Sequence, residues 1–220
     1  MSVRGVALRV LAPLLAVVAL VAACGGDDAL PPPTAAQTAT PSTVKVLPKD
    51  LPSMLPDIPQ ASEVLGFAIE GYQGSFLELG QEFEGIDLTT RTVGGSYFAL
   101  FRAGASGASG DTSAGGYMTV VLFAKPADAH AVFVAVAGGL TSGGGGSSRF
   151  EAKDIGEEFH GIVFGDDTEH TMVTAAVFRF QNVLATIVIF RDDGIELSLQ
   201  VRALARTVVE GIRAADAKNR

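Results

Sequence analysis

The chain has a single cysteine, Cys24, and this residue limits how the sequence that follows can be stabilised. A domain built after Cys24 has no internal disulfide, so its stability must come from a hydrophobic core. A domain of roughly 160 residues buries about 70% of the surface of its unfolded chain, which is sufficient for such a core. One domain is the expected number for this length.

Residues 1–23 have the composition of a secretory signal peptide. Arg4 and Arg9 are the only charged residues before Cys24, and an apolar stretch follows them. The stretch is shorter than the roughly 20 apolar residues that span a bilayer as a helix. Pro13 further disfavours a permanent membrane helix. We therefore expect residues 1–23 to be removed and to take no part in the fold.

The segment Val21-Ala22-Ala23-Cys24 has the order aliphatic, small, small, cysteine. It resembles the lipobox of bacterial lipoprotein precursors. The resemblance implies that the Cys24 thiol carries a diacylglycerol, that cleavage occurs before Cys24, and that a fatty acid such as palmitate is added there. Two or three acyl chains hold a protein stably on a membrane. The alternative is an ordinary signal-peptidase site in which Cys24 is only a small residue.

The charge of the chain argues against nucleic acid as a partner. The precursor has a net charge of -8, and without residues 1–23 it keeps 14 basic and 24 acidic side chains, a net charge of -10. Phosphate backbones and anionic headgroups repel an acidic domain. The membrane is therefore expected as a partner only through the lipid on Cys24, and the other partner is an unknown protein or small molecule.

Residues 24–50 are predicted to form a disordered tether between Cys24 and the domain. They contain Gly25-Gly26, then Pro31-Pro32-Pro33, and few large apolar residues. Such a composition buries too little apolar surface to fold. A flexible chain of this length spans on the order of 25–30 Å. The extracytoplasmic domain is predicted to occupy residues 51–216.

The hydrophobic pattern within the domain predicts a mixture of strands and helices. Residues 44–60 are proline-rich and are expected to be irregular. Residues 181–182 are expected to form a two-residue hairpin turn in which Asn182 tolerates a positive φ. The predicted strands are 64–72, 89–103, 117–124, 150–155, 161–165, 172–180 and 183–191, and the predicted helices are 76–84, 126–137 and 195–215.

The order strand, strand, helix occurs at 89–137 and again at 171–215. Hairpins that lead into helices form an antiparallel sheet with helices packed on it. The sequence therefore predicts an α+β domain with two strand-strand-helix halves, preceded by the signal peptide and the tether.

Several short motifs resemble those of extracytoplasmic bacterial lipoproteins and sensor domains without a defined activity. They are Lys49-Asp50-Leu51-Pro52, Ile155-Gly156-Glu157-Glu158, Phe178-Arg179-Phe180-Gln181-Asn182-Val183 and Leu204-Ala205-Arg206. The resemblance covers about residues 48–215 and implies a PsbP-like fold, an antiparallel sheet flanked by helices. Glu157 replaces the usual Asp, and Ser53-Met54 replaces Gly-Phe. The resemblance assigns no functional residue to this chain.

One region contains residue types that bind metals. His160, Asp166, Asp167, Glu169 and His170 lie within eleven residues, and imidazoles with carboxylates can bind a divalent ion. Their spacing matches no standard metal motif, so a solvated acidic loop over Asp166–His170 is the favoured interpretation.

No catalytic residue and no cofactor is predicted. The chain has no Gly-x-Ser-x-Gly motif, the glycines at 143–146 are not followed by a lysine, and Glu157-Glu158 lacks a tryptophan platform for sugars. The leading hypothesis is a membrane-anchored lipoprotein with a ligand- or protein-binding, sensor-like domain. The alternatives are an envelope hydrolase or metal-dependent enzyme that uses the His160–His170 region, and a structural envelope protein.

Overall fold

The computed structural model describes residues 43–75, 82–83, 86–87, 92–102, 114–142, 147–166 and 171–220. The predicted signal peptide, Cys24 and the predicted tether up to residue 42 lie outside these ranges.

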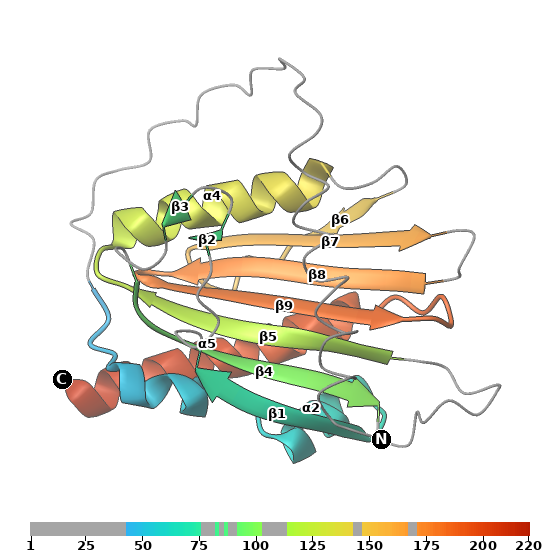
Figure 1. Ribbon diagram of the computed structural model, residues 1–220, viewed down its shortest axis with the longest axis horizontal. Helices are drawn as coiled ribbons and strands as arrows, with labels where there is room; N and C mark the ends of the chain where they lie inside the picture. Colours follow the sequence, from blue (N-terminus) through green and yellow to red (C-terminus); the bar gives the residue numbers. More distant parts are fainter. Residues whose placement is uncertain are drawn as a thin grey trace.

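A seven-stranded sheet forms the centre of the domain (Figure 1), and every neighbouring pair of its strands is antiparallel. The prediction of an α+β domain with an antiparallel sheet is thus confirmed. In spatial order the strands are β1 (Ile69–Ser75), β4 (Thr92–Arg102), β5 (Ala114–Phe123), β9 (Val183–Arg191), β8 (Thr171–Phe180), β7 (Glu158–Asp166) and β6 (Ser148–Phe150). Two short strands, β2 (Glu82–Phe83) and β3 (Ile86–Asp87), form a separate pair.

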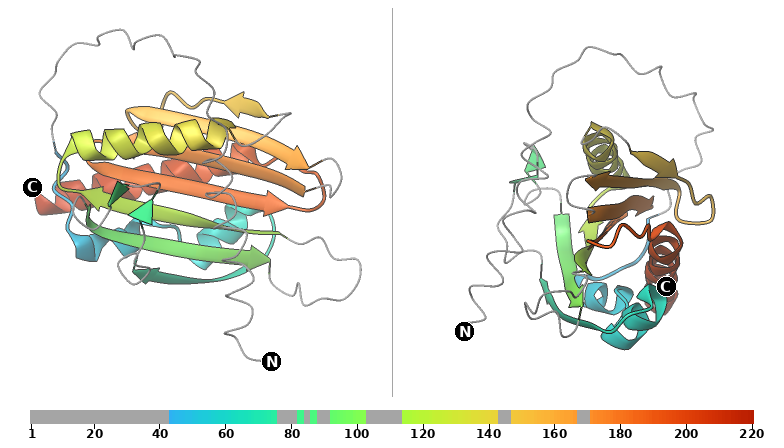
Figure 2. Two further views of the ribbon diagram at one scale, coloured as in Figure 1. Left: turned by 45° about the horizontal axis from the view of Figure 1, so that its top comes forward. Right: turned by 90° about the vertical axis from the view of Figure 1, so that its right-hand side faces the viewer.

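Helices pack on both faces of the sheet (Figure 2). The helix α4 (Pro126–Ser142) covers part of one face, and α5 (Ser198–Asn219) covers the other together with the 3-10 helix η2 (Pro48–Met54) and α2 (Ile58–Leu65). Alternate side chains of β5 enter the two cores, because successive residues of a strand point to opposite faces. Val120 packs in the core under α5 and Val121 in the core under α4. We call these the α5 face and the α4 face.

The predicted strand-strand-helix halves are present as β4–β5–α4 and β8–β9–α5. The predicted apolar stripe of α5 is also confirmed, since Val201, Leu204, Val208 and Ile212 are all fully buried at helical spacing. Burying each such side chain stabilises the fold by roughly 1.5–3 kcal/mol.

The prediction of an irregular segment over 44–60 was wrong for much of its length. Residues 48–54 form η2, and residues 58–65 form α2, where a strand was predicted from 64. The side chain of Asp57 caps α2 by accepting from the Gln60 N–H at 2.8 Å. Pro59 occupies the first turn, where a helix tolerates the missing N–H. The prolines led to the prediction of irregular chain, but Pro48 and Pro59 stand at the starts of helices.

Two further boundaries differ from the prediction. Glu82–Phe83 pair as β2 with β3, whereas a helix was predicted over 76–84; residues 76–81 and 84 lie outside the described ranges. Pairing with Ile86 and Asp87 on the other side of Gly85 is possible for a strand and not for a helix. Of the predicted strand 150–155, only Phe150 lies in a strand, at the end of β6. The chain turns after it, at Ala152, whose carbonyl accepts from the Ile155 N–H at 3.3 Å.

The hairpin between β8 and β9 has the predicted two-residue turn, but the positive φ of 55° falls on Gln181 instead of Asn182. The Asn182 side chain is buried and binds two other segments. Its Oδ1 accepts from the Val44 N–H at 3.2 Å, and its Nδ2 donates to the Phe123 carbonyl at 3.0 Å. Asn182 therefore joins the hairpin, the end of β5 and the entry of the chain into the domain.

A second junction joins the same entry segment to the last turn of α5. The Lys45 N–H donates to Asp216 at 2.8 Å. The buried carboxylate of Asp50 accepts from Asn219 at 2.9 Å and from the Leu47 N–H at 3.2 Å, with Lys218 at 3.6 Å. The Asn219 amide, the Leu47 N–H and the Lys218 charge together hold the pKa of Asp50 below its usual value, against the opposing effect of burial.

The Asn182→Ala variant is expected to lower the free energy of unfolding by about 2–4 kcal/mol, because it leaves the Val44 N–H and the Phe123 carbonyl without their amide partner. Urea unfolding of the mature chain measures this change. The control is Gln73→Ala, which removes an exposed amide from β1 and should change the stability by less than about 0.5 kcal/mol. Equal losses in the two variants would contradict the role of Asn182.

Candidate functional site

The predicted lipid-attachment residue Cys24 lies outside the described residues, so its modification stays a prediction. Within the described ranges, no helix combines the length and the apolar character needed to cross a bilayer.

The two described residues of the metal hypothesis, His160 and Asp166, are not brought together. His160 lies on β7, half-buried, with its Nε2 3.2 Å from the Thr141 hydroxyl of α4. Burial, and then the charge of Arg149, lowers the pKa of His160, which keeps the ring neutral at pH 7. Asp166 ends the same strand six residues later, about 20 Å away along the backbone. His160 and Asp166 thus cannot bind one ion.

Residues 167–170 lie outside the described ranges. Among the residues that are described, no three His, Cys, Asp or Glu side chains are placed to hold a metal ion.

Four charged or titratable side chains on the α4 face form an ion-pair cluster. Arg179 binds Glu157 at 2.7 Å and also contacts Glu158, and Glu158 contacts His130 Nδ1 of α4 at 2.7 Å. We call these residues, His130, Glu157, Glu158 and Arg179, the Arg179 cluster. Glu157 and Glu158 were weighed as paired catalytic carboxylates, but the structure pairs both with one guanidinium.

Sequence reasoning did not identify Arg179 as the centre of this cluster. The signal was present in principle, because Glu158 lies directly opposite Arg179 in the register of β7 and β8. Opposite charges facing each other across two antiparallel strands are a stabilising pair. The pairing of the two strands had to be known first, since 21 residues separate Glu158 from Arg179.

Gly156 brings the turn before β7 against Arg179. Its φ is +69°, and a Cβ added to it would lie 2.4 Å from the Arg179 carbonyl oxygen. The same carbonyl accepts from the Glu157 N–H at 2.8 Å. The close approach and the left-handed backbone both require glycine at this position.

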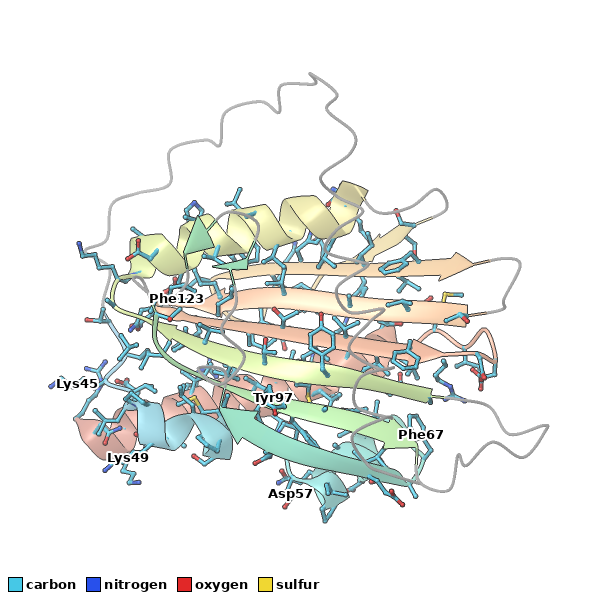
Figure 3. The ribbon with its side chains drawn as sticks, viewed as in Figure 1. Lys45, Lys49, Asp57, Phe67, Tyr97 and Phe123 are labelled. Atoms are coloured by element: carbon cyan, nitrogen blue, oxygen red, sulfur yellow. The ribbon has the colours of Figure 1, made fainter. Side chains whose placement is uncertain are left out.

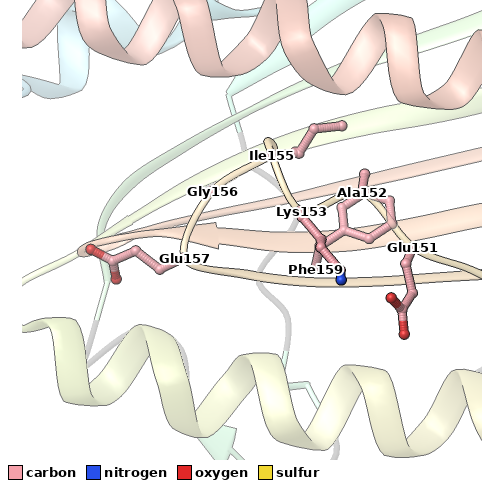
Figure 4. Close-up of a pocket in the computed structure, with 7 residues that line it drawn as sticks. All are labelled: Glu151, Ala152, Lys153, Ile155, Gly156, Glu157 and Phe159. Atoms are coloured by element: carbon pink, nitrogen blue, oxygen red, sulfur yellow. The ribbon is translucent and has the colours of Figure 1, made fainter. Parts of the chain in front are cut away.

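A shallow hollow of about 200 Å³ lies beside this turn (Figure 4). Its lining combines carboxylates, an ammonium group and apolar side chains, and consists of Glu151, Ala152, Lys153, Ile155, Gly156, Glu157 and Phe159. Ligand pockets usually enclose about 300–1,000 Å³. The hollow is smaller than such pockets and open to solvent, so it does not enclose a typical small-molecule ligand.

A second surface on the α4 face consists of tyrosine, threonine and small apolar side chains. In the register of β4, β5 and β9, Tyr97 lies opposite Thr119, which lies opposite Thr186, and the next row contains Ala99, Tyr117 and Val188. All six side chains are partly exposed, whereas Phe98, Met118 and Ile187 of the same strands are at most 1% exposed on the α5 face. We call these six residues the tyrosine surface (Figure 3, in which Tyr97 is labelled).

The helix α4 leaves the tyrosine surface uncovered because it lies mainly over β8, with fewer contacts to β5, β9 and β7. Its apolar side packs on Val121, Phe123 and Leu184, which lie nearer the β8–β9 hairpin than the tyrosine surface. The Tyr117 phenol is largely enclosed, and this burial raises its pKa to about 12. A tyrosine phenol is a neutral hydrogen-bond donor at pH 7 with or without this shift. The surface can make apolar and aromatic contacts and donate hydroxyl hydrogen bonds, without any charged group among its six residues.

Comparison with known proteins gives a similarity of fold. No family model matches the chain, and no curated protein matches its sequence. Among solved structures, the crystal structure of the extracellular domain of PknH from Mycobacterium tuberculosis matches with a TM-score of 0.54 and 14% sequence identity. The match covers 77% of this chain and 97% of that chain. This chain therefore has the fold of a known extracellular domain.

The Gly156→Ala variant is expected to lower the free energy of unfolding by about 1–3 kcal/mol, because its Cβ would meet the Arg179 carbonyl and its backbone would stay left-handed. The matched control is Gly138→Ala in α4, where an added Cβ meets nothing within 4 Å. That change should stabilise the helix by about 0.5–1 kcal/mol. Chemical denaturation measures both, and a gain in stability for Gly156→Ala would contradict the tight contact.

Proposed function

We propose that the protein is a membrane-anchored lipoprotein whose extracytoplasmic domain binds a protein or a small apolar ligand, in the manner of a sensor domain and without catalysis. The observation that carries the proposal is the fold, which this chain shares with almost the full length of the extracellular domain of PknH. The signal-like residues 1–23 support export independently of the fold.

The anchor in this proposal is the lipid on Cys24. About 20 residues separate Cys24 from Val44, where the chain enters the described domain. A flexible segment of this length has a root-mean-square span of about 25 Å. The domain would therefore stay close to the membrane and yet be free to meet a partner.

The tyrosine surface is the part of the described domain best suited to a partner. It combines two aromatic rings with hydroxyl groups, a composition that is enriched where proteins bind one another. Val93, near the start of β4, is a further exposed apolar side chain of the same strand, 45% exposed. The α5 face of the same strands is filled by α5 and η2, whereas α4 is the one described helix on the other face.

The proposal includes no catalysis, because the side chains considered as acids, bases or metal ligands are not placed to act on a substrate. Glu157 and Glu158 are both engaged by Arg179, and His160 is separated from Asp166 along β7. A general acid or base needs a free position within reach of a substrate proton. Neither candidate group offers one.

The Cys24→Ala variant tests the anchor. Cells fed an alkyne-bearing palmitate should label the wild-type protein and leave the variant unlabelled, because Cys24 is the only thiol in the chain. The variant should also keep its signal segment or appear outside the membrane fraction. Unchanged labelling of Cys24→Ala would contradict the lipoprotein proposal.

Photo-cross-linking tests the binding surface. The Tyr97→p-benzoylphenylalanine variant, irradiated in its own cell envelope, should give a discrete cross-linked product, because Tyr97 lies on the tyrosine surface. The control carries the same cross-linker at Leu199 of α5, a side chain that is 70% exposed on the opposite side of the sheet. If neither position gives a cross-linked product, or if both give the same product, the assignment is contradicted.

A further inference from the structure

Basic side chains gather where the chain enters the described domain. Of the 14 basic residues that follow residue 23, six exposed ones lie at this end of the molecule. We call them the basic end; they are Lys45, Lys49, Lys125, Arg213, Lys218 and Arg220.

Four of the six are placed together by contacts between the entry segment and the last turn of α5. The Lys45 backbone binds Asp216, and the Arg220 side chain binds the same carboxylate at 2.7 Å. Lys218 lies 3.6 Å from Asp50, the residue that follows Lys49. The labelled Lys45 and Lys49 lie beside the C-terminal end of α5 (Figure 3).

The other two flank the β8–β9 hairpin at the same end. The guanidinium of Arg213 lies over the ring of Phe180, the last residue of β8, at 5.6 Å. Lys125 follows Phe123 by two residues, and the Phe123 N–H donates to the Asn182 carbonyl of the hairpin at 2.9 Å. Through Asn182 both are tied to Val44 and hence to the entry segment.

Exposed cations outnumber exposed carboxylates at this end, where Glu157 and Glu210 are exposed and Asp128 is partly exposed. All six basic residues are exposed. The side chains of Asp50 and Asp216, by contrast, are 6% and 17% exposed. Glu210 is the one other carboxylate in the last turns of α5, over the described residues 210–220.

The acidic charge of the chain is therefore unevenly distributed over the domain. The turn at the opposite end of β9 contains Asp192, Asp193 and Glu196, and β7 ends there at Asp166. A domain that is acidic as a whole thus has a basic end, and this end is the one to which the predicted tether leads.

We infer that the basic end docks on anionic phospholipid headgroups of the membrane that holds Cys24, an inference that rests on the proposed function. The sequence alone predicted repulsion from such headgroups, because only the net charge was known. Each Lys or Arg close to an anionic surface strengthens binding by about fivefold. A tether of the predicted length would keep the basic end within tens of Å of the headgroups, so that a weak attraction would be enough to orient the domain.

Docking at this end fixes which parts of the domain face the aqueous compartment. The acidic turn 192–196 would point away from the membrane. The tyrosine surface, which lies on the flank between the two ends, would stay accessible to a partner beside the domain.

Vesicle flotation tests the inference independently of lipidation. The mature chain with Cys24→Ser, which cannot be lipidated, is floated with vesicles of phosphatidylcholine containing 30% phosphatidylglycerol or none. We expect binding only to the anionic vesicles at 50 mM NaCl, and a loss of that binding at 300 mM NaCl, because salt screens exposed charges. No binding to the anionic vesicles would overturn the inference, and it would leave the Cys24 labelling result unaffected.

Two charge-matched variants locate the binding surface. The Lys49→Gln/Lys125→Gln variant removes two exposed cations of the basic end and should weaken the partition onto anionic vesicles by about 25-fold. The Arg149→Gln/Lys153→Gln variant removes two exposed cations elsewhere and should weaken it by less than about threefold. Equal losses would overturn the assignment to the basic end. Stronger retention on polyglutamate beads than on the vesicles would assign this end to an acidic protein instead and overturn the lipid assignment.

Discussion

The buried amide of Asn182 determines how the parts of this domain fit together. It bonds the entry of the chain at Val44 and the end of β5 at Phe123, and it does so from the turn between β8 and β9. The three segments are far apart in the sequence, and one side chain accepts from the first and donates to the second. Because a buried polar group without a partner is costly, this arrangement permits little alternative geometry.

The sequence was a good guide where periodicity is strong and a poor one where proline dominates. The strands β8 and β9 and the apolar stripe of α5 were predicted because alternation and 3.6-residue spacing report directly on burial. The helices η2 and α2 were missed, because a proline at the start of a helix resembles a proline that breaks one. The positive φ was assigned to Asn182, whose side chain is instead committed to the core, and Gln181 adopts it.

In the candidate site, too, some features could be predicted from the sequence and others could not. The sequence shows that Glu157 and Glu158 are adjacent. It does not show that both contact Arg179, because that contact depends on the strand register, which local sequence does not encode. The tyrosine surface likewise depends on three strands lying side by side and on the position of α4. The metal hypothesis failed for His160 and Asp166 because proximity in sequence along an extended strand means separation in space.

The attachment of the entry segment also determines how the domain bears a mechanical load. A pull on the tether reaches the fold at Val44 and Lys45, which are bonded to Asn182 and Asp216 and have no part in the edge strand β1. The force is thus passed to the β8–β9 hairpin and to the last turn of α5, and β1 is not peeled from the sheet. Under tension, the domain is held by its most deeply buried elements, and its resistance is set by the rate at which those elements open.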